Sequence, residues 1–106
     1  MPALDNAMYQ WQDGERRLRD AEPADQSHLE RVVDLVIEEL RRRLGSKFEV
    51  GELVDLYYEG TDWAEHLAQR RFAGGDTSAV VDAAFWRYAR GAANFAGGRT
   101  RYVDEG

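Results

Sequence analysis

The sequence predicts an all-α protein, a compact bundle of four or five helices in a single domain over residues 1–106. Three observations support this fold class. Apolar residues recur at three- and four-residue spacings, glycines and Pro23 separate the segments in which they recur, and no segment alternates apolar and polar residues like a strand. A chain of 106 residues also has the usual size of one domain with one core.

The N-terminal segment, within residues 1–24, is expected to form a helix. Its apolar residues share one helical face: Leu4, Met8, Trp11 and Leu18. Glu15 interrupts this face, and Gly14 weakens the middle of the helix. The helix should break at Glu22-Pro23, because a proline disfavours helical conformation in the preceding residue.

A second helix is predicted to begin at Ser27, which has the spacing of a capping box with Glu30. Its apolar stripe consists of Leu29, Val32, Val33, Val36, Ile37, Leu40 and Leu44. Gly45 follows the last apolar residue and is expected to end the helix.

The third segment could begin at Ser46 or at Glu49, and we favour Glu49, with Phe48 packed on Leu53 across the first turn. Gly60 should end this helix, and Thr61 or Asp62 should cap the next one at once. The apolar face of that fourth helix would contain Trp63, Ala64, Leu67, Arg71 and Phe72.

A last helix should start after the glycine pair 74–75, with Asp76 or Thr77 as its cap. Its stripe would be Val81, Ala84, Phe85, Tyr88, Ala92 and Phe95. The glycine pair 97–98 should stop it, and the tail 99–106 should fray because it has no periodicity.

Composition limits where such a protein works. No stretch approaches the roughly 20 apolar residues of a membrane span, and the first residues lack the layout of a secretory signal. Cysteine is absent, which fits a reducing compartment, so we expect a cytoplasmic protein without membrane contact. Lys47 is the one lysine among 14 basic residues, a bias that points to a GC-rich bacterium.

The sequence contains no recognisable catalytic or metal-binding motif, so we expect neither an enzyme nor a cofactor. His66 follows Asp62 by four residues, a spacing that could present two ligands, but no third ligand is marked and zinc needs more than two. The glycine pairs lack the lysine and hydroxyl residue of a phosphate loop.

The residues that suggest binding lie near the C-terminus, where arginines alternate with aromatic residues and no acid intervenes from Ala83 to Tyr102. The predicted partner-binding residues are Trp86, Arg87, Arg90, Arg99, Arg101 and Tyr102. Met8 and Trp11 form a possible second partner surface, on an amphipathic N-terminal helix.

These observations favour a non-enzymatic, cytosolic protein–protein interaction or regulatory module, with a homodimer as one form of it. The alternative is a nucleic-acid-associated regulator that uses the arginine-rich C-terminal helix and tail, or a helix-turn-helix-like pair at 49–72. The net charge of −6 opposes nucleic acid, as do Asp62 and Glu65, which lie where base-reading residues should be.

Overall fold

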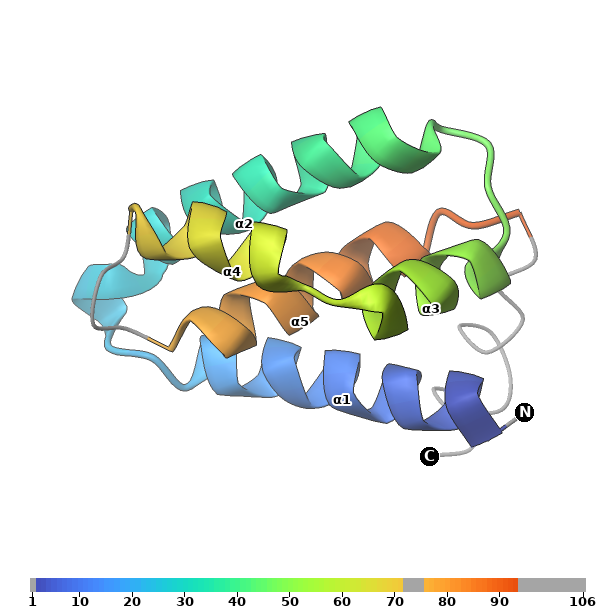
Figure 1. Cartoon of the computed structure of the whole chain (residues 1–106). Coiled ribbons are helices and arrows are strands. Elements are labelled where there is room, and N and C mark those ends of the chain that lie inside the picture. The colour runs from blue at the N-terminus through green and yellow to red at the C-terminus, as the bar shows by residue number, and fades with distance from the viewer. Residues whose placement is uncertain (1, 72–75, 94–106) are drawn as a thin grey trace.

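The structure, a computed structural model, describes residues 2–71 and 76–93. Within these ranges the chain forms five helices and no strand (Figure 1), which confirms the predicted all-α bundle. The helices are α1 (Pro2–Arg19), α2 (Pro23–Leu44), α3 (Val50–Glu59), α4 (Asp62–Gln69) and α5 (Thr77–Ala89). None of them combines the length and apolarity that crossing a membrane would require. The predicted tail 99–106 lies outside the described residues.

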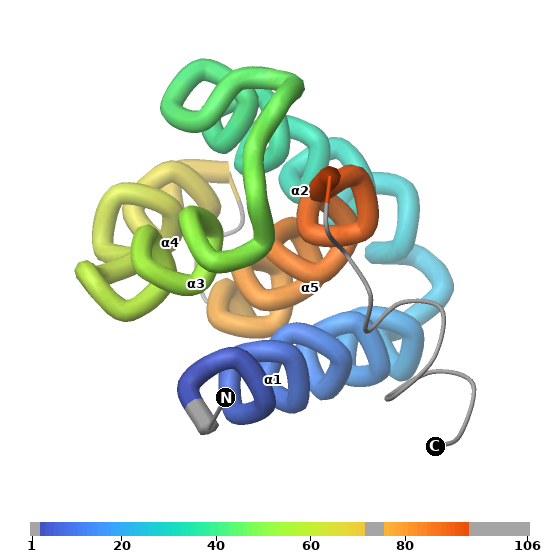
Figure 2. The backbone as a smooth tube through the Cα atoms, turned by 90° about the vertical axis from the view of Figure 1, so that its right-hand side faces the viewer, coloured from blue at the N-terminus to red at the C-terminus, as the bar shows by residue number. Residues whose placement is uncertain are grey.

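Helix α5 lies at the centre of the bundle, and the other four helices pack around it (Figure 2). Of its 13 residues 11 are buried, on every side of the helix. The described members of the predicted stripe are buried, but burial extends beyond them, because small residues such as Val80, Ala83 and Ala89 let neighbouring helices cover the other faces of α5. The helix also ends at Ala89, before the glycine pair 97–98 expected to stop it, and Phe95 lies outside the described residues.

Helix α1 packs most extensively against α5, and Gly14 is the reason the two come so close. A Cβ atom on Gly14 would overlap the Cβ of Asp82 and would lie 3.1 Å from the carbonyl oxygen of Ala79. Gly14 is thus a point of close backbone approach, and Glu15 does not interrupt the packing because it pairs with Arg87 of α5.

Helix α2 begins earlier than predicted. It starts at Pro23, with no side-chain cap, and Ser27 lies inside the helix as an exposed residue. The predicted capping box was wrong because proline is favourable in the first helical turn and because Glu30 pairs with Arg87 instead. The predicted end is confirmed: Gly45 follows the helix with a φ of 80°.

The short helices α3 and α4 follow the local signals closely. The favoured start of α3 is confirmed, since Glu49 is its N-cap, and the Glu49 backbone N–H donates to the Glu52 side chain over 3.0 Å. Gly60, with a φ of 135°, separates α3 from α4, and Thr61 is the N-cap of α4. Helix α4 ends at Gln69, and Phe72, expected on its apolar face, lies outside the described residues.

Candidate functional site

The predicted partner-binding aromatic residues are placed in the core. Trp86 is 8% exposed, Met8 1% and Trp11 0%. Trp11 lies against Phe85 of α5 and edge-on to Tyr57 of α3, with ring centroids 5.8 Å and 5.6 Å apart. The partner surface expected of Trp86, Met8 and Trp11 does not fit this placement, because the helices of the same chain already remove their apolar area from water.

Arg87 is engaged inside the protein as well. Its guanidinium donates to both carboxylate oxygens of Glu15 on α1 at 2.8 Å, and to those of Glu30 on α2 at 2.6 and 3.0 Å. The hydrogen bonds to Glu15 and Glu30 raise the pKa of Arg87, and the bond from Arg87 holds the pKa of Glu30 below its ordinary value. Arg87 therefore ties α5 to α1 and α2 instead of facing a partner.

The remaining predicted residues are one exposed arginine and three that the structure does not describe. Arg90 caps the C-terminus of α5 and is exposed, so it is available to a partner. Arg99, Arg101 and Tyr102 lie outside the described residues.

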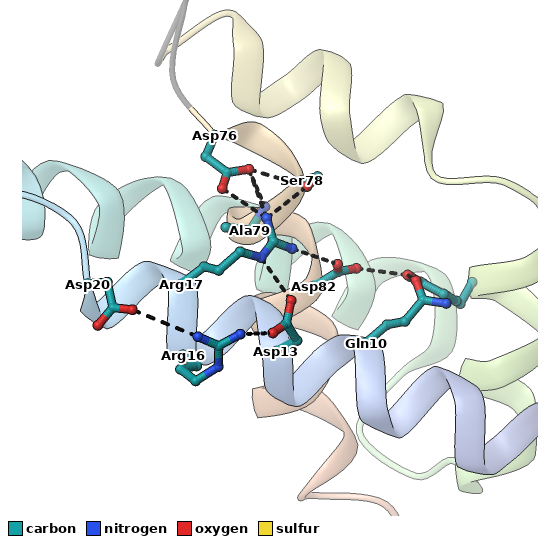
Figure 3. A network of polar contacts seen from close by, with 10 residues as sticks. Gln10, Asp13, Arg16, Arg17, Asp20, Asp76, Ser78, Ala79 and Asp82 are labelled. Carbon is teal, nitrogen blue, oxygen red and sulfur yellow. Dashed lines mark hydrogen bonds and ion pairs between the residues drawn. The ribbon is translucent and has the colours of Figure 1, made fainter.

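A buried polar cluster on α5 was missed by the sequence reasoning. The side chain of Asp82 is 11% exposed, at the place where α5 meets α1 and α3 (Figure 3). The Tyr57 hydroxyl lies 2.9 Å from an Asp82 oxygen and 2.9 Å from the Gln10 side-chain oxygen. A hydroxyl has one proton and donates to one acceptor at a time, and the charged Asp82 oxygen is the stronger acceptor. The available signal was the acid itself, alone in the apolar run AVVDAAF.

Arg17 joins this cluster to the start of α5. It lies 3.5 Å from Asp82, and it also donates to Asp13 at 3.0 Å and to Asp76 at 2.8 Å (Figure 3). Asp76 caps α5, as predicted, by accepting from the Ala79 backbone N–H at 3.1 Å. The single charge of Arg17 is therefore shared among three carboxylates.

The surroundings of Asp82 favour the protonated, uncharged form of its carboxyl group. Burial raises the pKa of Asp82 to about 6 from an ordinary 3.8, although the hydrogen bond from Tyr57 and the charge of Arg17 act in the opposite direction. Burial also raises the pKa of the Tyr57 hydroxyl, which stays a donor at every physiological pH.

Two pockets formed by described residues offer little room for a substrate. One, of about 210 Å³, lies between the α1–α2 turn and the start of α5, beside Leu18 and Asp25. The other, of about 260 Å³, lies beside Phe48 and Tyr88. Both are smaller than the roughly 300–1,000 Å³ of typical small-molecule sites. Neither is lined by His66 or Asp82, and the described residues hold no group of three side chains that could bind a metal.

The outer face of α3 carries an acidic surface. Glu52, Asp55 and Glu59 follow one another at three- and four-residue steps, and all three are exposed; we call them the acidic stripe. Helix α3 contains no basic residue, and no ion pair between described residues includes a member of the stripe. The stripe therefore presents its negative charge to solvent without a counterion from the described part of the chain.

Tyr58 lies beside the acidic stripe and is 50% exposed. Its hydroxyl donates to the Ala3 carbonyl oxygen at 3.3 Å, and its ring lies edge-on to Tyr57 with centroids 5.4 Å apart. These contacts hold an aromatic ring in place at the edge of a charged surface. Tyr9 of α1 is the other large exposed aromatic residue of the described ranges, at 74%.

No known protein family, curated protein or solved structure matches the chain, so its function is inferred from these residues alone.

Proposed function

We propose that this chain is a non-enzymatic, cytosolic interaction module that binds a basic segment of a partner protein through the acidic stripe and Tyr58. The observation that carries the proposal is the stripe itself: three exposed carboxylates on the solvent face of a helix that has no basic residue. The module remains the function expected from the sequence, but its contact surface moves from the C-terminal helix to α3.

Two members of the acidic stripe, Asp55 and Glu59, lower the stability of the helix that carries them, whereas Glu52 supports its first turn. Asp55 and Glu59 are like charges four residues apart, which costs about 0.2–0.5 kcal/mol. Glu59 is the last residue of α3, where a negative charge opposes the helix dipole at a cost of about 0.3–1 kcal/mol. A surface that keeps unfavourable charges in this position is typical of one selected for binding.

Helices α1 and α2 place basic residues beside some of their acids. On α2, Arg43 pairs with Glu39 at 3.1 Å, and three arginines occupy the last turn, where they complement the dipole. On α1, Arg17 pairs with Asp13 at 3.0 Å. Helix α3 therefore differs from α1 and α2 in having no basic residue beside its acids.

Tyr58 adds a reason for a cationic partner. A lysine or arginine over a tyrosine ring gains about 0.5–1 kcal/mol at an exposed site. The ring is held by its hydroxyl and by Tyr57, so little side-chain entropy is lost when a partner binds.

The negative charge of this surface also opposes the two other partners, a second copy of the chain and a nucleic acid. A symmetric dimer through α3 would place two acidic stripes face to face, and a nucleic acid would bring phosphates to them. The arginine-dependent nucleic-acid alternative loses Arg87, which is already paired with Glu15 and Glu30.

The proposal is tested with a labelled 16-residue amphipathic peptide of lysine and leucine, titrated into the intact protein. The test variant is Asp55→Asn with Glu59→Gln; the matched control is Asp34→Asn with Glu38→Gln, which removes two exposed acids four residues apart on α2. Loss of two charge contacts should weaken binding about five- to tenfold in the test variant and less than about twofold in the control.

Chemical-shift mapping of the same titration locates the peptide, and the shifts should concentrate on 52–59. Equal weakening in both variants, or shifts spread evenly over every acidic surface, would refute the proposal. Self-association of the protein alone, or retardation of DNA or RNA at low salt, would favour the homodimer or the nucleic-acid alternative instead.

A further inference from the structure

Asp82 occupies the seam where α1, α3 and α5 meet. Tyr57 of α3 lies 2.9 Å from one of its oxygens, and Arg17 of α1 lies 3.5 Å from the other. Beside it Gly14 lets the backbones of α1 and α5 approach with no side chain between them. In place of most of its hydration the carboxylate therefore has one hydrogen bond of ordinary length and one long ion pair.

We propose that Asp82 is a proton-controlled latch, which holds the seam between α1, α3 and α5 firmly closed when protonated and lets it open more readily when ionised. The reason is the difference in hydration. An ionised carboxylate gains much more than a neutral one when the seam opens and water reaches it.

The groups around Asp82 offset this difference only in part. From α1 it faces Arg17 and Asp13, from α3 the Tyr57 hydroxyl, and from α4 the carboxylate of Glu65. Arg17 is the one cation of this set, and it is shared with Asp13 and Asp76. On the α2 side the charged contact with α5 is the Glu30–Arg87 pair, five residues farther along α5.

The size of the effect follows from proton linkage. Burial raises the pKa of Asp82 to about 6 in the closed seam, whereas a hydrated Asp82 in the open seam keeps its ordinary value of 3.8. The closed state therefore binds more protons between these values, and raising the pH through them favours opening. The full change in the opening constant is on the order of a hundredfold, of which about 25-fold falls between pH 4.5 and 7.5.

Asp82 is also connected to the exposed surface of α3. Tyr57 connects Asp82 to α3, and its ring neighbour Tyr58 lies beside the acidic stripe. Opening of the seam releases this anchor, so α3 is held less firmly at neutral pH than at pH 5. The consequence for partner binding rests on the proposed function; the latch itself does not.

Amide hydrogen exchange measures the latch directly. Opening constants are determined for the α5 amides around Asp82 at a series of pH values, corrected for intrinsic exchange rates, in the intact wild-type protein and in Asp82→Asn. The wild type should show about a 25-fold larger opening constant at pH 7.5 than at pH 4.5, relative to Asp82→Asn, which mimics the protonated form. Parallel pH profiles in the two proteins would overturn the proposal.

Tyr57→Phe provides a second, directional readout. The Tyr57 hydrogen bond lowers the pKa of Asp82, so its removal should move the midpoint of the opening profile to higher pH. An unchanged midpoint, or one shifted to lower pH, would contradict the latch.

The variant Asp55→Asn with Glu59→Gln separates the two proposals. It should keep the pH profile of the wild type while losing affinity for the basic peptide. A profile flattened by this variant would assign the pH dependence to α3 instead of Asp82.

Discussion

Gly14→Ala distinguishes the close approach of α1 and α5 from an ordinary helical glycine. A glycine in the middle of a helix is less stable than alanine by about 0.5–1 kcal/mol, so the sequence alone predicts that this substitution stabilises the protein. The structure predicts the opposite sign. The new methyl group would overlap the Cβ of Asp82 and would lie 3.1 Å from both the Ala79 carbonyl oxygen and the Ala83 nitrogen.

The magnitude follows from what must move. Two of the three atoms that crowd the methyl group belong to the α5 backbone, so no rotation of a flexible side chain relieves the contact. Insertion of one carbon into a packed interface costs about 1–3 kcal/mol. After the propensity gain of alanine is subtracted, Gly14→Ala should lower the free energy of unfolding by about 1–2 kcal/mol.

Gly51→Ala is the matched control, because Gly51 is also helical but a methyl group there would meet no atom of another segment within 4 Å. It should raise the free energy of unfolding by about 0.5–1 kcal/mol. Urea denaturation followed by circular dichroism measures both variants against the wild type. A Gly14→Ala protein at least as stable as the wild type would refute the close packing of α1 on α5.

Three further predictions concern the charges of the bundle and the exposed tyrosine. Arg87→Met leaves Glu15 and Glu30 unpaired, so it should lower the free energy of unfolding at pH 7, measured by urea titration, by about 2–4 kcal/mol. Arg87→Lys should be intermediate, because one ammonium cannot bridge both carboxylates in the same bidentate way. Equal stability of the wild type and both variants would contradict this. Asp82 has a raised pKa, so the loss of stability from burying its charge is absent below pH 3.8 and complete above about pH 6. Asp82→Asn should therefore stabilise the protein by about 1–3 kcal/mol at pH 7.5 and by less at pH 4.5. A gain independent of pH would be inconsistent with the burial of an ionised group. Tyr58→Ala should weaken binding of the basic peptide about two- to fivefold while stability, measured in the same urea assay, changes by less than about 1 kcal/mol; unchanged affinity would remove Tyr58 from the site.

Helix positions could be predicted from the sequence because the signals that fix them are local. Gly45 and Gly60 ended the helices where expected, and Asp76 capped α5 as predicted. The start of α2 was misplaced because two local signals competed, the Ser27 capping spacing and the Pro23 helix start. A non-local contact also acts against the box: Glu30, needed for it, pairs with Arg87, 57 residues away in the chain.

The burial of side chains could not be predicted in the same way, because it depends on how many helices surround each element. Periodicity places Trp86 beside the main stripe of α5, where a side chain is exposed if one neighbour packs there and buried if several do. Four helices surround α5, so Trp86 is core. The sequence shows that α3 has acids and no base, but the exposure of the acidic stripe depends on which side of α3 packs against the bundle.

The two charged residues of α5 that contact α1 also fix how these helices meet. Arg87 pairs with Glu15, and Asp82 lies near Arg17, so the two helices run antiparallel with one register. A slide of one helical turn, about 5.4 Å, would separate both charge contacts and would move Gly14 away from the α5 backbone at Ala79. Helix α1 is therefore an integral part of the bundle, in contrast to an N-terminal helix free to dock on a partner.

Charge exchange tests whether pairing, and not only burial of Arg87, specifies the register. Arg87→Glu places a third carboxylate beside Glu15 and Glu30 and should destabilise the protein more than Arg87→Met does. Adding Glu15→Arg to Arg87→Glu gives the new carboxylate a guanidinium partner on α1, with the polarity of the α1–α5 contact reversed and Glu30 still beside position 87. The double variant should recover at least about 1 kcal/mol of the loss in a double-mutant cycle. Additive losses would show that the pair does not define the register, and that the apolar packing around Gly14 is sufficient to hold α1 on α5.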